Sequence, residues 1–162
     1  MKKYAIITDN NTKTVDVALG TDIEFFKVLG MVEMDVEQAP NGQWYVAGYV
    51  PIDELKQAKI NEFKNIRDTE EVKPIEYNGN LFDFDEKARD RINSAIIALD
   101  ITGQSIEWTT ADNTNVLVTA DDLRGVVANV AVRSNQLHAK YRELKEQVLD
   151  CTTAEEVAEI VW

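Results

Sequence analysis

The chain is poor in the residues that most catalytic and metal centres use. It has 162 residues but only one cysteine, Cys151, and one histidine, His138. A single cysteine excludes a disulfide within the chain and fits a reducing compartment. Zinc sites need cysteine and histidine ligands at short spacings, which are missing here. We therefore expect no metal site and no disulfide framework.

The same scarcity argues against enzymatic chemistry. A nucleophilic hydrolase needs a nucleophile, a base and an orienting group, and His138 and Cys151 lie far apart along the chain. The few glycines fall mostly at turns, so no phosphate-binding glycine loop or nucleophile elbow is present. Acidic clusters such as Asp83, Asp85 and Glu86 lack the order of ligands in a calcium loop. We expect no catalytic residues and no cofactor.

Positive charge is also scarce. The chain has 29 acidic and 17 basic residues, for a formal net charge of −12, which repels nucleic acid and anionic lipid surfaces. No apolar run approaches the roughly 20 residues that span a bilayer. The apolar stretch in residues 3–7 is too short for a signal peptide. These features predict synthesis and assembly in the cytosol, with no nucleic acid or membrane partner.

What the sequence does contain is a clear succession of elements, beginning with alternating apolar and polar residues typical of strands. An Asn41-Gly42 pair between two such segments indicates a hairpin. Thr21-Asp22 and Gly30 bracket a two-turn helix over 23–29. We predict an antiparallel sheet with one short helix in residues 1–50; its four strands cover 3–8, 14–19, 31–38 and 43–49.

The following segment, 52–71, is rich in helix formers but has a thin apolar stripe, which predicts a partly exposed connecting helix. Its apolar residues are Ile52, Leu55, Ile60, Phe63 and Ile66. The remainder predicts two hairpins, a helix capped by Asp85, a long helix from Thr119-Asp122 to about Leu149, and a final short helix with a Thr153/Glu156 capping box. The predicted class is α+β, and the predicted domains are 1–50, a connecting helix over 51–73, and 74–162.

The long helix has a heptad-like apolar seam. Its positions are Leu123, Val127, Val130, Ser134, Leu137, Tyr141, Leu144 and Val148. Basic residues line the edges of this seam and would face each other between identical helices: Arg124, Arg133, His138, Lys140 and Lys145. Acidic residues of neighbouring helices complement them within one chain: Asp85, Glu86 and Asp90, or Glu155, Glu156 and Glu159. We therefore favour packing within the chain, while a homo-oligomer through the seam stays open.

Aromatic residues cluster on the predicted hairpins. Tyr45, Tyr49 and Trp108 are candidates for a surface that binds a partner protein or a glycan. The alternative for each is the core of a sheet. We favour a core position for Trp44 and Trp108. Tyr45 points to the opposite face of the strand from Trp44, and for this residue a core position and a surface position both stay open.

From Arg67 to Trp162 the order of landmarks resembles the small C-terminal domain shared by bacteriophage tail fibre, baseplate-associated and tail fibre assembly proteins. These landmarks are Arg67, Asp68, Tyr77, Gly79, Phe82, Asp83, Ile92, Trp108, Thr110, Asp112, Asn113, Leu123, His138, Glu156 and Trp162. The segment around Gly30-Met31 and Met34–Gln38, through Trp44-Tyr45, is similar to leader segments of short phage tail-region proteins. The resemblance implies a scaffold without an active site. One departure is that no long repetitive shaft precedes the C-terminal region.

The resemblance implies a non-enzymatic tail structural protein of a phage or prophage that docks on a tail fibre or baseplate component, with the 1–50 sheet as an adaptor. It would then be located in the virion tail. One alternative is a fibre assembly chaperone that acts in the host cytoplasm. Another is a carbohydrate-binding module for host recognition.

Overall fold

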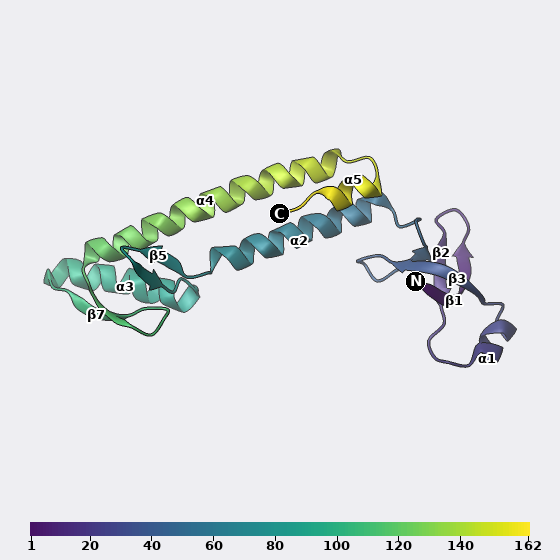
Figure 1. The fold of residues 1–162 in the computed structure, drawn as a ribbon, viewed down its shortest axis with the longest axis horizontal. Coiled ribbons are helices and arrows are strands. Elements are labelled where there is room, and N and C mark those ends of the chain that lie inside the picture. Colours follow the sequence, from purple (N-terminus) through teal and green to yellow (C-terminus); the bar gives the residue numbers. More distant parts are fainter. The chain divides into compact units, whose positions relative to one another are not determined.

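The computed structural model describes residues 1–162 and has an α+β fold (Figure 1). Its contacts divide the chain into two compact units. The first contains Met1–Glu62 together with Glu146–Val161, and the second contains Phe63–Lys145 together with Trp162. The predicted domain ranges follow chain order, whereas each of these units combines segments that are distant in the sequence.

Four antiparallel strands form a small closed barrel in the first unit. They are β1 (Lys2–Asp9), β2 (Thr14–Val17), β3 (Val32–Gln38) and β4 (Trp44–Val46), in the order β1-β2-β4-β3. The sequence predicts these strands but not their closure. The barrel closes because β1 pairs with β3 as well as with β2, while β4 pairs with both β2 and β3. Its centre is filled by Ala5, Val15 and Val36, each at most 1% exposed.

The short helix α1 (Ile23–Val28) connects β2 to β3. The Asp22 side chain accepts a hydrogen bond from the Phe25 backbone N–H, which caps the first turn. Phe26 is turned inward, and its ring centroid lies 6.0 Å from that of Tyr4 on β1. Gly30 follows with a φ of 77°, a left-handed conformation that ends the helix and leads into β3.

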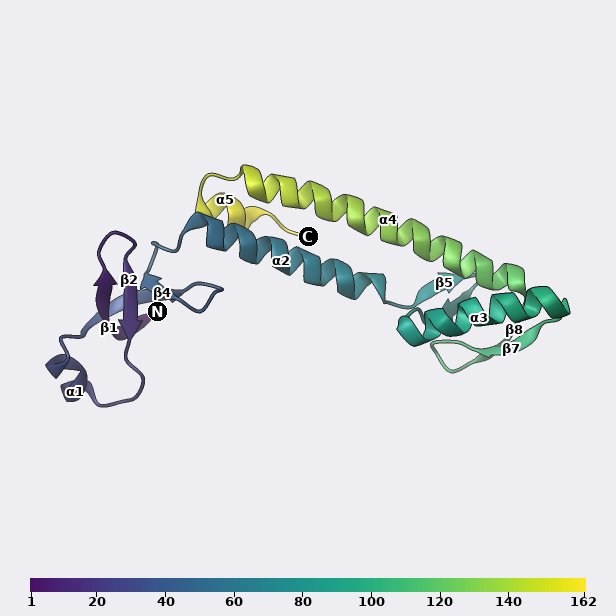
Figure 2. The same cartoon turned by 180° about the vertical axis from the view of Figure 1, so that it is seen from behind.

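Helices α2 (Ile52–Glu71) and α4 (Ala120–Asp150) lie side by side and run antiparallel (Figures 1 and 2). The Lys56 ammonium donates to the Leu149 carbonyl oxygen at 2.7 Å in the first unit. Helix α2 is partly exposed, as expected, and two residues of its predicted apolar stripe lie in the core: Ile60 is 7% exposed and Phe63 is fully buried. An irregular apolar stripe is sufficient for this burial because residues of other segments cover it. The ring of Trp162, for example, lies 6.0 Å from the ring of Phe63.

Helix α5 (Ala154–Glu159) begins with the predicted capping box. The Glu156 backbone N–H donates to Thr153 Oγ1 at 3.2 Å, while the Glu156 carboxylate accepts from the Thr153 backbone N–H at 3.1 Å. These hydrogen bonds satisfy amide groups that the first turn of a helix leaves without partners. The Glu156 carboxylate is therefore engaged within its own helix.

The second unit is built from two hairpins, a helix and most of α4. Strands β5 (Ile75–Tyr77) and β6 (Asn80–Phe82) are joined by Asn78 and Gly79, both at positive φ as an Asn-Gly turn requires. Helix α3 (Glu86–Thr102) is capped by Asp85 and ends at Gly103, with φ 65°. Strands β7 (Ile106–Thr109) and β8 (Asn115–Val118) follow. The shared core is Phe82, Ile92, Leu99, Trp108, Val118, Leu123 and Val126.

Candidate functional site

Glu71, at the last turn of α2, is the centre of a polar contact between α2 and α4. Its Oε1 atom accepts a hydrogen bond from Ser134 Oγ at 2.6 Å and lies 3.0 Å from His138 Nε2. Ser134 and His138 are four residues apart on α4, so they share one side of that helix. The Glu71 carboxylate is thus held by two side chains from one neighbouring helix.

Arg133 binds the C-terminal end of α2. Its Nη2 atom donates to the Glu71 carbonyl oxygen at 2.8 Å, and its Nη1 atom donates to the Pro74 carbonyl oxygen at 3.2 Å. The last carbonyl groups of a helix have no partners within it and carry partial negative charge, so a cation there is favourable. Desolvation lowers the pKa of Arg133, while the charges of Glu70 and Glu71 act in the opposite direction. The guanidinium therefore acts as a C-terminal cap for α2.

This cluster does not have the geometry of a catalytic triad. In a triad the imidazole lies between the hydroxyl and the carboxylate, so that it can take the hydroxyl proton. Here one carboxylate oxygen lies between Ser134 and His138. A neighbouring hollow of about 450 Å³ is lined by Val72, Phe84, Val130 and four polar or charged side chains: Glu71, Glu86, Arg89 and Ser134. The arrangement joins two helices through one carboxylate.

The predicted seam of α4 faces inward in each unit. Leu123, Val130, Leu144 and Val148 are at most 8% exposed, and Val127, Leu137 and Tyr141 are half-buried. The Arg67 guanidinium lies 4.8 Å from the centre of the Tyr141 ring. Sequence reasoning missed Val126, which is fully buried because this stretch of α4 is enclosed by β-hairpins and α3 rather than by one partner helix.

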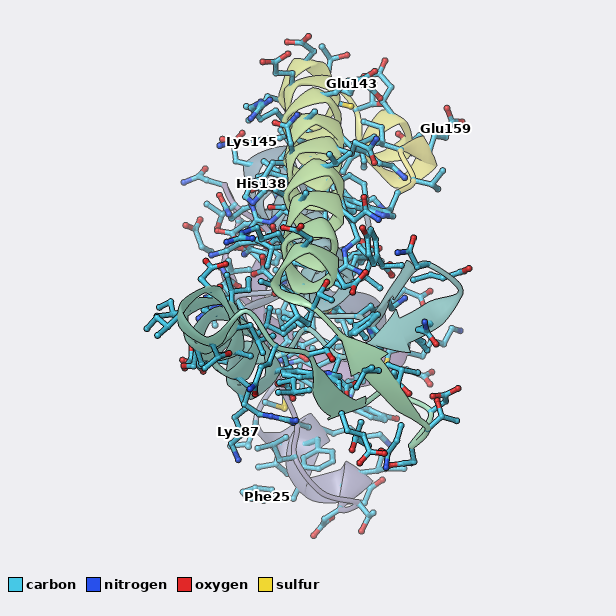
Figure 3. The ribbon with its side chains drawn as sticks, turned by 90° about the vertical axis from the view of Figure 1, so that its left-hand side faces the viewer. Phe25, Lys87, His138, Glu143, Lys145 and Glu159 are labelled. Carbon is cyan, nitrogen blue, oxygen red and sulfur yellow. The ribbon has the colours of Figure 1, made fainter.

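The basic edge of α4 finds partners within the chain, but not the predicted ones. Arg124 pairs with Asp100 of α3 and with Asp121, and His138 pairs with Glu71 of α2. Lys140 lies over the ring of Trp162, 4.9 Å from its centre. Figure 3 shows His138 and Lys145 on one side of α4. The predicted acidic partners near Asp85 and Glu155 need correction because Asp85 instead caps α3 and Glu156 accepts from the Thr153 backbone N–H at the start of its own helix, α5.

The structure confirms the core position favoured for Trp108 and also buries Tyr45, so the candidate binding surface of Tyr45, Tyr49 and Trp108 needs correction at two of its three positions. Tyr45 and Trp108 are each 7% exposed, and the Arg91 guanidinium covers one face of the Trp108 indole at 4.8 Å. Trp108 belongs to the core because β7 lies against α3 and α4, and Tyr45 is buried although it alternates with Trp44 along a three-residue strand. Only Tyr49, at 54%, is exposed.

An exposed apolar surface on α1 was not predicted. Phe25, Val28 and Leu29 follow the i, i+3, i+4 spacing of a single helix side and are 55%, 83% and 49% exposed. Two further exposed apolar residues flank the helix, Leu19 at 92% and Val32 at 56%. We call Phe25, Val28 and Leu29 the α1 face. The sequence signal was present, because a helix of this length with apolar residues on nearly every side cannot bury all of them against a small barrel.

No group of three or more histidine, cysteine or acidic residues is arranged to hold a metal ion. No helix combines the length and the apolar character that crossing a bilayer requires.

No curated protein matches this chain. No solved structure matches it either. One family model matches residues 54–161, which include α2 from its first turn and the second unit apart from Trp162. This chain therefore belongs to the family described as Domain of unknown function (DUF4376).

Proposed function

We propose that this protein is a non-enzymatic structural component of a bacteriophage or prophage tail, and that it docks on a tail fibre or baseplate protein. The α1 face carries the proposal. Isolated exposed apolar residues are ordinary, but apolar side chains gathered on one rigid element mark interaction surfaces. Phe25 lies on the outer side of α1 (Figure 3) and remains 55% exposed.

The order of landmarks from Arg67 to Trp162 supports the phage tail assignment, since it resembles the C-terminal domain of tail fibre and fibre assembly proteins. Residues 1–50 then act as the adaptor, and the second unit provides the scaffold. The polar cluster around Glu71 fits this role because its side chains connect helices. Docking through a small apolar face suits a part present in several copies, where avidity strengthens a weak contact.

Mass spectrometry of purified phage particles tests the proposal. We expect the protein to be abundant in particles and to cross-link to a fibre or baseplate protein. A variant with Phe25→Ser and Val28→Ser should be lost from particles, whereas Leu117→Ser, which alters an equally exposed residue of β8, should be retained. Absence from particles combined with binding to fibre protein in the host cytoplasm would replace the proposal with an assembly chaperone.

A further inference from the structure

We propose that the barrel of the first unit binds an extended segment of the partner protein, which adds an antiparallel strand along β2 at Val17 and Leu19. We call these two residues the β2 edge. This inference rests on the docking function proposed above and specifies how the partner is held. It follows from backbone groups without partners at the β2 edge, from a hollow beside them, and from the side chains around that hollow.

Part of β2 has no neighbouring strand on its β4 side. Only two residue pairs join these strands: Thr14 with Tyr45 and Val15 with Trp44. In an antiparallel ladder, consecutive residues direct their backbone groups to alternate sides. The Ala18 N–H donates to the Tyr4 carbonyl oxygen on β1, so the N–H and C=O of Val17 point the other way, toward β4. Neither these groups nor those of Leu19 form a backbone hydrogen bond.

Gly42 lies where the next partner of β2 would be, but its backbone is engaged elsewhere. Continuing the register between β2 and β4 would set Gly42 opposite Val17. The chain turns instead, and Gly42 has a φ of 89°. Its N–H donates to the Ala39 carbonyl oxygen at 2.9 Å, and its carbonyl oxygen accepts from Gln38 Nε2 at 3.0 Å. The β2 edge therefore stays open for another chain.

A hollow of about 480 Å³ lies beside the β2 edge. Its apolar lining comes from Val15, Val17, Leu19 and Trp44. Val17 and Trp44 are half-buried and pack against the barrel core, whereas Leu19 is 92% exposed. Directly paired residues of neighbouring strands turn their side chains to the same face. A partner residue opposite Val17 thus contacts this apolar lining, which selects an aliphatic side chain.

The backbone groups of the β2 edge identify the occupant as an extended chain. In strand addition, main-chain hydrogen bonds provide affinity and alternate side chains provide specificity. A helix uses its backbone groups internally, and neither a sugar nor a lipid tail repeats donors and acceptors at the spacing of a strand. Residues 16–19 also contain neither the lysine nor the proline that commonly protects an exposed edge.

Asp16 selects a basic residue on the outer face of the added strand. It lies between the paired residue Val15 and the β2 edge, and its side chain is exposed and makes no ion pair within the chain. Charge complementarity sets partner choice, so a lysine or arginine beside Asp16 fits this position. The predicted segment therefore alternates aliphatic and basic residues. The net charge of −12 disfavours a second copy of this chain as the occupant.

Hydrogen exchange of the purified full-length chain tests whether the edge is open. The Val17 amide should exchange faster than the Val15 amide, because Val15 is paired with Trp44. A seven-residue peptide of alternating valine and lysine should slow exchange at Val17. Equal protection of the two amides in the free chain would overturn the proposal.

Two methylated versions of the valine–lysine peptide test for backbone pairing. One carries a methyl group on every valine nitrogen, which removes the N–H groups directed at β2, and the other on every lysine nitrogen, where the N–H groups point to solvent. We expect the valine-methylated peptide to bind at least about tenfold more weakly than the unmethylated one, and the lysine-methylated peptide to match the latter. Equal binding of all three peptides, or binding by none, would overturn the proposal.

Matched variants locate the contact. Val17→Pro removes the N–H that has no partner and costs the barrel no ladder hydrogen bond, so it should abolish peptide binding, whereas Val17→Ala keeps this N–H and should retain binding. Asp16→Asn should weaken binding, while Asp53→Asn, at an exposed position of α2, should not. Circular dichroism of each variant checks its fold. Unchanged binding by a folded Val17→Pro variant would contradict the proposal.

Two further measurements separate the alternatives. Sedimentation velocity should show a monomer, and a dimer that Val17→Pro abolishes would assign the β2 edge to a second copy instead. If phage particles contain the protein and also retain its Val17→Pro variant, the proposed function stands and this inference fails. If particles lack the protein although the peptides discriminate, the β2 edge binds an extended segment of another protein and the proposed function fails.

Discussion

The ring of Tyr77 lies directly against the backbone of Gly125. A Cβ atom added to Gly125 would be 2.1 Å from Tyr77 Cζ and 2.2 Å from its hydroxyl oxygen. Gly125 is in α4, where glycine is about 1 kcal/mol less favourable than alanine. The close approach of the β5 hairpin to α4 requires glycine at this position, and that packing offsets the loss in helix propensity.

Gly125→Ala should therefore destabilise the protein by about 1–3 kcal/mol, the usual range for overpacking, despite the better helix propensity of alanine. Chemical denaturation measures the change. In a Tyr77→Ala background the same substitution should stabilise the protein by up to about 1 kcal/mol, because the overlap is gone. Destabilisation of equal size in both backgrounds would show that the ring is not the cause.

The contact between Phe63 and Trp162 should contribute strongly to stability. Phe63 is fully buried, and its ring lies 6.0 Å from that of Trp162. We expect Phe63→Ala to cost about 3–5 kcal/mol of unfolding free energy. Trp162→Ala should cost less because its indole is only half-buried, while Val161→Ala, at a residue 72% exposed, should remain within about 0.5 kcal/mol of wild type. Equal values for Trp162→Ala and Val161→Ala would contradict the contact.

The Glu71 cluster should behave as a coupled unit. Ser134→Ala removes one hydrogen bond to the carboxylate and should cost about 1 kcal/mol. Glu71→Ala removes the acceptor for both Ser134 and His138, so we expect a larger loss than for Ser134→Ala. A double-mutant cycle between Glu71 and Ser134, followed by urea denaturation, should give a nonzero coupling energy. Strictly additive losses would show that the two side chains stabilise the protein independently. Asn65→Ala, on the exposed side of α2, serves as the control.

Acidification should destabilise the start of α4. Hydrogen bonds from the Thr119 hydroxyl and backbone N–H hold the pKa of Asp122 below its ordinary value of 3.8. Because the folded state favours the ionised carboxylate, this contribution is complete above pH 3.8 and is lost as the pH falls through the lowered pKa. Asp122→Asn should lower the free energy of unfolding near neutral pH. At lower pH, the difference in this free energy between the variant and the wild type should become smaller. Glu76→Gln, at an exposed position of β5, should keep the wild-type pH dependence in the same urea titrations.

Local signals in the sequence identify nearly every element of this fold. Asn78-Gly79 specifies its hairpin because both residues adopt positive φ, and Thr153 with Glu156 specifies the start of α5 through two backbone hydrogen bonds. Asp85 does the same for α3. Such signals act over a few residues, so they can be recognised without knowledge of the tertiary structure.

The candidate sites were harder to predict because exposure depends on what covers a side chain. The sequence favoured a core position for Trp108 and left both positions open for Tyr45, and both side chains are 7% exposed. The α1 face consists of apolar residues of the kind that fill a core, yet Val28 is 83% exposed. Alternation and helical spacing identify the apolar side of an element, but they do not say whether another element lies against it.

The sequence by itself determined the strands, helices, caps and turns, because hydrogen bonding and backbone preference within a few residues are enough to specify them. Only the tertiary structure decided the closure of the barrel, the burial of Phe63 and the approach of Tyr77 to Gly125. These features depend on contacts between residues far apart in the chain, where shape and volume rather than local preference decide which surfaces meet.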